Sequence, residues 1–153
     1  MAAEESVPGP KVAEITRVQE LAYQLKIAQV MTAPVVTVTP DTRMADLKEI
    51  LRTRRISGTP VVEGGRLVGI VSIEDLIKAL ERGDLDAPVS RWMTPHVVTV
   101  RADDSVIEAV KRFAQHGVGR LPVVDAEGHL VGILTGGDIT RGLLEAVGLG
   151  YQE

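Results

Sequence analysis

Hydrophobic and polar positions follow the same order twice along the chain. In residues 59–76, two short apolar runs flank a polar turn, and the second run leads into residues with helical spacing. Residues 121–139 repeat this order, with turn-forming residues at 125–128 between the two runs. Short runs rich in β-branched residues on both sides of a glycine-containing turn are typical of a β hairpin. Each stretch therefore predicts two buried strands followed by a helix.

Apolar residues at helical spacing predict further helices. A first helix is expected over residues 12–28, where the apolar positions are Val12, Ile15, Val18, Leu21, Ala22, Leu25 and Ala28. Short strands are expected at 35–38 and 97–100, each followed by a helix. Ser105 and Glu108 have the spacing of a capping box at the start of the second of these helices. The last helix is expected from Asp138 to about Ala146.

The matching stretches belong to one internal repeat. The pairs Met31–Met93, Thr37–Thr99, Val38–Val100, Pro60–Pro122 and Val61–Val123 are each 62 positions apart. After the hairpin turn the separation is 63, in the pairs Gly69–Gly132, Ser72–Thr135 and Asp75–Asp138. One residue added in a surface turn explains the change, because such turns tolerate insertions. Each half is too small to bury much core alone, so the halves are expected to pack against each other with pseudo-two-fold symmetry and a crevice on each side.

The expected fold class is α/β (α+β), with two related halves preceded by a helix. The expected parts are a flexible tail at 1–11, an N-terminal helix at 12–28, a first repeat at 29–82, a linker at 83–91 and a second repeat at 92–147.

Composition narrows the chemistry that the chain can perform. It has 153 residues, a net charge of −4, no cysteine and only 3% aromatic residues. The acidic balance and the scarcity of aromatic side chains argue against nucleic-acid binding. The lack of cysteine removes disulfides and thiolate chemistry, and the three histidines are far apart in the sequence. No apolar run approaches the roughly 18 residues that span a membrane, and the acidic start has no signal-peptide core. A cytoplasmic protein is the expectation.

Two helix starts carry the candidate chemistry. Ser72 with Asp75, and Thr135 with Asp138, place a hydroxyl and a carboxylate three residues apart where a helix is expected to begin. Free backbone N–H groups at a helix N-terminus attract phosphate, and a carboxylate can accept hydrogen bonds from a ribose diol. Arg120 adds a planar fork of donors suited to phosphate oxygens. The alternative is purely structural: the two motifs would be N-caps and Arg120 a surface ion pair.

The repeated order Met-Thr, Thr-Val, helix, Pro-Val-Val, Gly-Ile and Ser/Thr-x-x-Asp resembles a tandem CBS-domain pair (cystathionine-β-synthase domains). The resemblance covers roughly residues 27–146. It implies two β-α-β-β-α units, association into disc-like homodimers, and crevices that bind an adenosine ligand such as AMP, ADP, ATP, S-adenosylmethionine or NAD. It also implies a regulatory role, such as energy sensing, without catalysis and without a required cofactor.

The resemblance further implies the residues that would contact the ligand. Ser72, Asp75, Thr135 and Asp138 match the family motif for ribose and phosphate. Thr39 and Arg101 match the position after the first strand, and Gly58 and Arg120 match a position that is often basic and meets phosphate. The backbone beside Pro60 and Pro122 matches the part that reads the adenine edge. Gly58 lacks the charge that Arg120 brings to the second repeat.

Two functions remain open from the sequence. The first is a ligand-sensing regulatory module that binds an adenosine nucleotide or derivative and acts on a partner protein in trans. The alternative is a dimerisation or docking scaffold with empty crevices. An enzyme lacks support, because the residues contain no nucleophile–base pair at a recognisable spacing. The sequence identifies no catalytic residue and no metal ligand.

Overall fold

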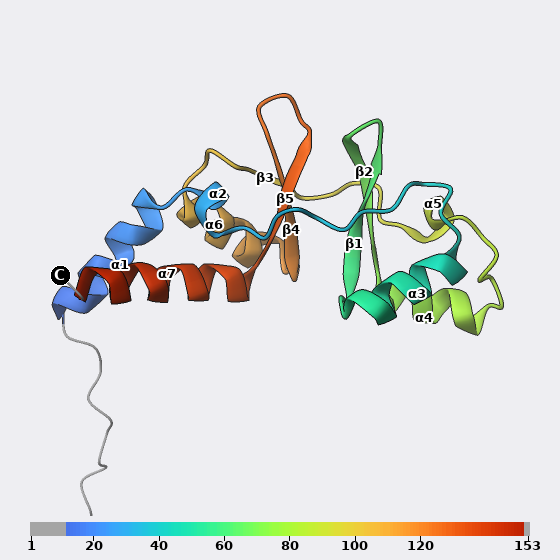
Figure 1. Ribbon diagram of the computed structural model, residues 1–153, viewed down its shortest axis with the longest axis horizontal. Helices are drawn as coiled ribbons and strands as arrows, with labels where there is room; N and C mark the ends of the chain where they lie inside the picture. The colour runs from blue at the N-terminus through green and yellow to red at the C-terminus, as the bar shows by residue number, and fades with distance from the viewer. Residues whose placement is uncertain (1–11, 152–153) are drawn as a thin grey trace, which may run out of the picture.

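A computed structural model describes residues 12–151 as an elongated molecule with two halves side by side (Figure 1). The predicted tail at 1–11 lies outside the described residues. The elements are α1 Val12–Gln24, α2 Ile27–Val30, α3 Met44–Arg54, β1 Gly58–Glu63, β2 Arg66–Ser72, α4 Ile73–Glu81, α5 Val89–Trp92, β3 Val100–Arg101, α6 Val106–His116, β4 Arg120–Val124, β5 Leu130–Thr135 and α7 Gly136–Tyr151. Among these residues, none of the helices has the length and hydropathy needed to cross a bilayer.

Each half contains the predicted hairpin, and the two hairpins have matching registers. Strands β1 and β2 form a two-stranded antiparallel sheet, and β4 pairs with β5 in a sheet that also holds the short parallel strand β3. Pro60 lies opposite Ile70, and Pro122 lies opposite Ile133. Both hairpins have a register shift after the first valine of the Val-Val pair. The internal repeat in the sequence is therefore also a structural repeat.

Each half has its own aliphatic core, and each core includes a residue from outside the repeat that forms the rest of it. Val89, from α5, is fully buried among residues of the first hairpin, α3 and α4. Ile27, from α2, is fully buried among residues of the second hairpin, α6 and α7. Ile27 and Val89 are 62 positions apart, so the two halves exchange equivalent segments. The chain crosses between the halves after each of these short helices (Figure 1).

Backbone hydrogen bonds hold the exchanged segments in the same way. The Val89 amide donates to Thr42 O at 2.7 Å, and the equivalent Ile27 amide donates to Asp104 O at 2.9 Å. Segment 83–91, which we expected to be a linker, makes contacts with the first half, because the Met44 amide donates to Ala87 O at 2.9 Å and Val89 lies in the first core. Leu85, in the same segment, packs against this core.

The N-terminal helix predicted over 12–28 is interrupted. It ends at Gln24, and α2 begins at Ile27. The Val106 amide donates to Leu25 O at 2.9 Å, and Lys26 forms a bridge with Ser105. These contacts use backbone groups that would form hydrogen bonds within a continuous helix. Pairing with the second half therefore interrupts the helix.

Four other local predictions differ from the structure. The strand expected at 35–38 is reduced to one parallel bridge between Val38 and Val61, and the strand expected at 97–100 is limited to β3. Ser105 is the N-cap of α6, but its side chain makes no capping bond. The last helix extends past the predicted end to Tyr151, and α7 packs against α1.

Candidate functional site

Two clefts lie at equivalent places between the halves. The first, which we call the Asp138 cleft, has a volume of about 330 Å³. The second, the Asp75 cleft, has a volume of about 570 Å³. Thr32, Val35, Val36 and Ile56 line the first, and residues 62 positions later, Thr94, Val97, Val98 and Val118, line the second. Both volumes fall in the range of small-molecule sites, so the pseudo-symmetry predicted from the sequence creates two candidate sites.

Asp138 is the most constrained polar group of its cleft. Its side chain is buried, with 6% exposed. The Thr135 amide donates to Asp138 Oδ2 at 3.0 Å, and the Asp138 amide donates to Thr135 Oγ1 at 3.2 Å, which is the predicted reciprocal cap at the start of α7. Thr32 Oγ1 donates to Asp138 Oδ1 at 3.2 Å, and Arg141 also bonds this oxygen. A carboxylate has about four acceptor positions, so three bonds leave about one for a ligand hydroxyl.

Asp75 occupies the equivalent place with fewer partners. It is half-buried at the start of α4. The Ser72 amide and the Ser72 hydroxyl both donate to Asp75 Oδ2, at 2.9 and 3.1 Å. Among the described residues, no hydrogen bond ends on Oδ1. Lys78, which corresponds to Arg141, lines this cleft together with His96. The Asp75 carboxylate therefore has more open acceptor capacity than that of Asp138.

Arg120 lies between the two clefts and lines both of them. Its Nη2 donates to Ser57 Oγ, which also lines both clefts. A Cβ built on Gly58 would lie 3.1 Å from Arg120 Cζ and closer still to Nη1. The glycine in the first repeat therefore leaves room for the arginine of the second.

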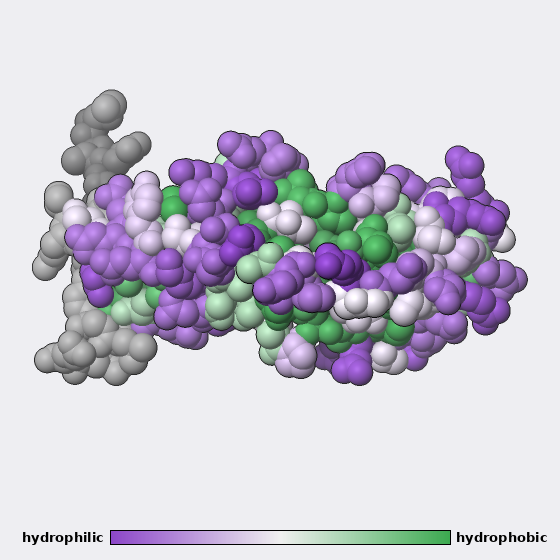
Figure 2. Space-filling model, turned by 90° about the horizontal axis from the view of Figure 1, so that it is seen from above, coloured by the Kyte–Doolittle hydropathy of each residue, from purple (hydrophilic) through white to green (hydrophobic). Residues whose placement is uncertain are grey.

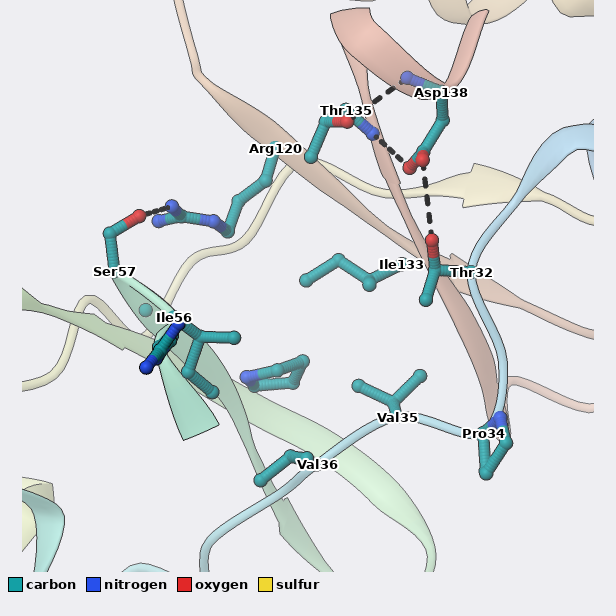
Figure 3. Close-up of a pocket in the computed structure, with 13 residues that line it drawn as sticks. Thr32, Pro34, Val35, Val36, Ile56, Ser57, Arg120, Ile133, Thr135 and Asp138 are labelled. Carbon is teal, nitrogen blue, oxygen red and sulfur yellow. Dashed lines mark hydrogen bonds between the residues drawn. The ribbon is translucent and has the colours of Figure 1, made fainter. Parts of the chain in front are cut away.

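Apolar side chains form the other wall of the Asp138 cleft. Figure 3 shows Arg120 directed toward Ser57 and Asp138 directed toward Thr32, with the remaining labelled side chains largely apolar. Apolar residues also reach the surface near the middle of the molecule, where the hairpins lie (Figure 2). A flat apolar wall beside a carboxylate and a guanidinium can accept a molecule with a ring, a diol and an anionic group.

The clefts bring together seven of the ten predicted site residues. Gly58, Pro60, Arg120, Thr135 and Asp138 line the Asp138 cleft, and Ser72, Asp75 and Arg120 line the Asp75 cleft. Three others lie elsewhere. Thr39 is exposed and shares a 3.1 Å hydrogen bond with Thr42, Arg101 pairs with Asp103 at 2.8 Å, and Pro122 is buried in β4. These three do not line either cleft.

Sequence reasoning did not include several lining residues. Thr32 and Ser57 supply hydroxyls to the Asp138 cleft, and Lys78 and His96 supply basic side chains to the Asp75 cleft. The 63-position offset that pairs Asp75 with Asp138 also pairs Lys78 with Arg141, so the repeat contained a signal for Lys78. Ser57 gave no such signal, because its counterpart is Gly119.

The sequence signature of the CBS domain matches residues 27–82 and 89–145. A 17.7 kDa protein of Acidianus ambivalens, of uncharacterised function, is 31% identical over 78% of this chain and 74% of its own length. Inosine-5′-monophosphate dehydrogenase of Thermoplasma acidophilum is 36% identical over 69% of this chain, which spans only 21% of that enzyme. The chain spans 39% of protein MJ1232 of Methanocaldococcus jannaschii.

Solved structures show the same fold. CBSX2 in complex with AMP superimposes with a TM-score of 0.71 at 32% identity, over 79% of this chain and 97% of that one. The CBS domain pair of protein MJ0100, in complex with 5′-methylthioadenosine and S-adenosyl-L-methionine, has a TM-score of 0.69 at 28% identity, over 76% and 94% of the two chains. With two matched repeats and this shared architecture, the chain belongs to the CBS domain family and carries a tandem pair of CBS domains.

Proposed function

We propose that this chain is a regulatory sensor that binds an adenosine nucleotide or derivative in the clefts between its two CBS domains. The observation that carries the proposal is that Asp75 and Asp138 stand at equivalent helix starts, each in a cleft that also contains Arg120. The AMP complex of one structural relative and the S-adenosylmethionine complex of another support the ligand class.

The residues suggest how such a ligand would lie. The carboxylate of Asp138 would accept a ribose hydroxyl, because about one of its acceptor positions is open and its Thr32 bond can be exchanged for a ligand bond. The apolar wall, including Val35 and Ile133, would cover the base. Arg120 would donate to phosphate oxygens, because its planar fork matches them. The ligand would then contact both repeats and favour one relative placement of the two, which is how binding could signal to a partner protein.

Calorimetric titration of the purified chain with AMP, ADP, ATP, S-adenosylmethionine and NAD tests the proposal, with UMP as the control for the base. Binding of at least one adenosine compound, and not of UMP, is the expected result. At 100-fold over its dissociation constant, the ligand should also raise the free energy of unfolding by about 2.7 kcal/mol. If none of these compounds binds at millimolar concentration, the sensor proposal is wrong and the scaffold alternative is favoured.

A matched pair of variants connects binding to the clefts. Asp138→Ala and Asp75→Ala each remove one carboxylate, and each should weaken binding in its own cleft while the fold is retained. Circular dichroism checks that both variants are folded. A ligand that binds both variants and the double variant as tightly as the unmodified chain would be bound somewhere else.

The scaffold function has one specific observation in its favour. Ile73, Ile77 and Leu80 are 44–49% exposed and share one face of α4, with spacings of four and three residues. The equivalent helix in the second repeat, α7, packs against α1. No equivalent of α1 covers α4 among the described residues. We propose that a second copy of the chain covers this face in a homodimer.

Sedimentation analysis tests the homodimer. Ile77→Asp should shift the chain toward monomer, because it places a charge in the proposed interface. Leu144→Asp, the control, changes an apolar residue of α7 that is 66% exposed. A monomeric unmodified chain, or a dimer disrupted only by Leu144→Asp, would show that the α4 face is not the interface. Nucleotide binding is a separate measurement, so either property can hold without the other.

A further inference from the structure

The two clefts share polar residues only at their boundary. Ser57 and Arg120 are the residues common to both linings. They come from different repeats, and their counterparts are Gly119 and Gly58 respectively. The boundary therefore holds one hydroxyl and one guanidinium, bonded to each other, where two equivalent sets would be expected from the pseudo-symmetry.

Steric space explains why there is one guanidinium. A Cβ on Gly58 would approach Arg120 Cζ to 3.1 Å and the carbonyl oxygen of Val71 to 3.1 Å. Distances of this size already require the neighbours to move. A second long side chain at position 58 would compete with Arg120 for the same volume. The packing thus permits one cation at this boundary.

The remaining cations differ between the clefts. Arg55 lines the Asp138 cleft, whereas Lys78 and His96 line the Asp75 cleft. Arg141 has an ion pair with Asp138 and is not part of the lining. Among the described residues, Arg120 is therefore the one arginine that lines both clefts, whereas Arg55 lines only the Asp138 cleft.

We propose that Arg120 is a shared phosphate-binding group for which the two clefts compete. A phosphorylated adenosine ligand in one cleft would engage the guanidinium and draw it away from the other cleft, so a second phosphorylated ligand would bind more weakly. If both phosphates did reach the same guanidinium, their negative charges would repel at short distance, which gives coupling of the same sign. A ligand without phosphate does not use Arg120, so its two binding events would be independent. This inference rests on the proposed function.

Calorimetric titration of the full chain with AMP and with adenosine tests the competition. With AMP we expect two unequal binding events, with dissociation constants separated by about 5- to 150-fold, the usual size of coupling between sites. With adenosine we expect a smaller separation than with AMP, because only the linings that the two clefts do not share then contribute to it. Two AMP molecules bound with equal affinity would overturn the inference and leave the proposed function standing. If adenosine shows as large a separation as AMP, the inequality does not come from phosphate competition and the inference is wrong.

Variants assign the coupling to Arg120. Arg120→Gln should weaken the first AMP event and reduce the separation between the two events to less than about threefold, because neither phosphate then has a shared cation to lose. Arg112→Gln is the matched control, since Arg112 is exposed, bonds to Thr99 O and lines neither cleft. An Arg120→Gln chain that keeps the full separation overturns the proposal. If neither AMP nor adenosine binds the unmodified chain, the proposed function is wrong, and the competition is wrong with it. If they bind without the expected coupling, only the competition is wrong.

Discussion

Met31 packs directly over Gly132, in the hairpin of the second repeat. A Cβ on Gly132 would lie 2.9 Å from Met31 Cγ and closer to its sulfur. The equivalent pair in the first repeat is similar, because a Cβ on Gly69 would lie 3.0 Å from Met93 Cγ. Beside each pair, the crossing segment bonds the hairpin: the Thr32 amide donates to Ile133 O at 2.9 Å, and the Thr94 amide donates to Ile70 O at 2.8 Å. Glycine at positions 132 and 69 leaves room for the segments that begin at Met31 and Met93 to pack against these two hairpins.

Gly132→Ala should therefore destabilise the protein. The added methyl group must displace Met31, and adding a methyl group to a packed site costs about 1–3 kcal/mol. Met31→Ala in the same chain should recover part of this loss, so the two changes should be non-additive. Urea unfolding of the single and double variants measures the effect. Strict additivity would mean that the methionine does not limit the space at Gly132.

Gly58→Ala should cost less stability but alter the clefts. Part of the clash is with the mobile end of Arg120, so a loss of about 1 kcal/mol is expected, at the low end for added volume. The displaced guanidinium should change AMP affinity. Gly119→Ala is the control, because a Cβ there meets no atom within 4 Å, and its stability should change by less than about 0.5 kcal/mol. Equal losses in the two variants would contradict the close packing at Gly58.

Asp138→Ala should destabilise the chain more than Asp75→Ala. Asp138 is buried and accepts bonds from Thr32, Thr135 and Arg141, whereas Asp75 is half-buried and is bonded by Ser72. We expect a loss of about 1.5–3 kcal/mol at Asp138, typical of hydrogen bonds to a charged group, and about 0.5–2 kcal/mol at Asp75, typical of an N-terminal cap. Denaturant titration without ligand gives both values. The reverse order would show that the additional partners of Asp138 are not stabilising.

Ile27→Ala should be severely destabilising although it lies outside the second hairpin and its helices. Ile27 is fully buried in the second core, and truncation of a buried isoleucine costs about 2–5 kcal/mol. Leu144→Ala serves as the exposed control and should change stability by less than about 0.5 kcal/mol. A small effect at Ile27 in thermal unfolding would show that α2 is not part of this core.

Asp125 should make the second hairpin sensitive to acid. Its pKa is lowered from 3.8, first by the His129 amide, and also by the Glu127 amide, which donate to its Oδ1 at 2.9 Å each. A carboxyl group with a lowered pKa stabilises the folded state above its unfolded pKa, and this contribution is lost as the pH falls through the folded pKa. The stability difference between the unmodified chain and Asp125→Asn should therefore shrink as the pH falls below 3.8. A carbon NMR titration of the Asp125 carboxyl group with a midpoint at or above 3.8 would show that its pKa is not lowered.

The hairpins and the helix-start motifs were predictable because each depends on residues close together in sequence, and the repeat was predictable because residues 62 or 63 positions apart match. Ser72 with Asp75, and Thr135 with Asp138, are three positions apart, and their hydrogen bonds form within one helical turn. The hairpin turns and the apolar periods are equally local. The offset of 62 or 63 positions between the repeats then implied a pair of related clefts, with Arg120 in place of Gly58.

The exchange of segments depended on the tertiary structure. The residues around Ile27 and Val89 in the sequence do not indicate which core each side chain joins. The sequence therefore did not distinguish a linker at 83–91 from a packed segment. The break after Gln24 arises where Leu25 and Lys26 bond to the second repeat. Ser105, whose side chain makes no capping bond, forms a bridge with Lys26 at the same place. Likewise, only the folded chain places Arg120 on Ser57 and between both clefts, because that position depends on how two repeats far apart in sequence pack together.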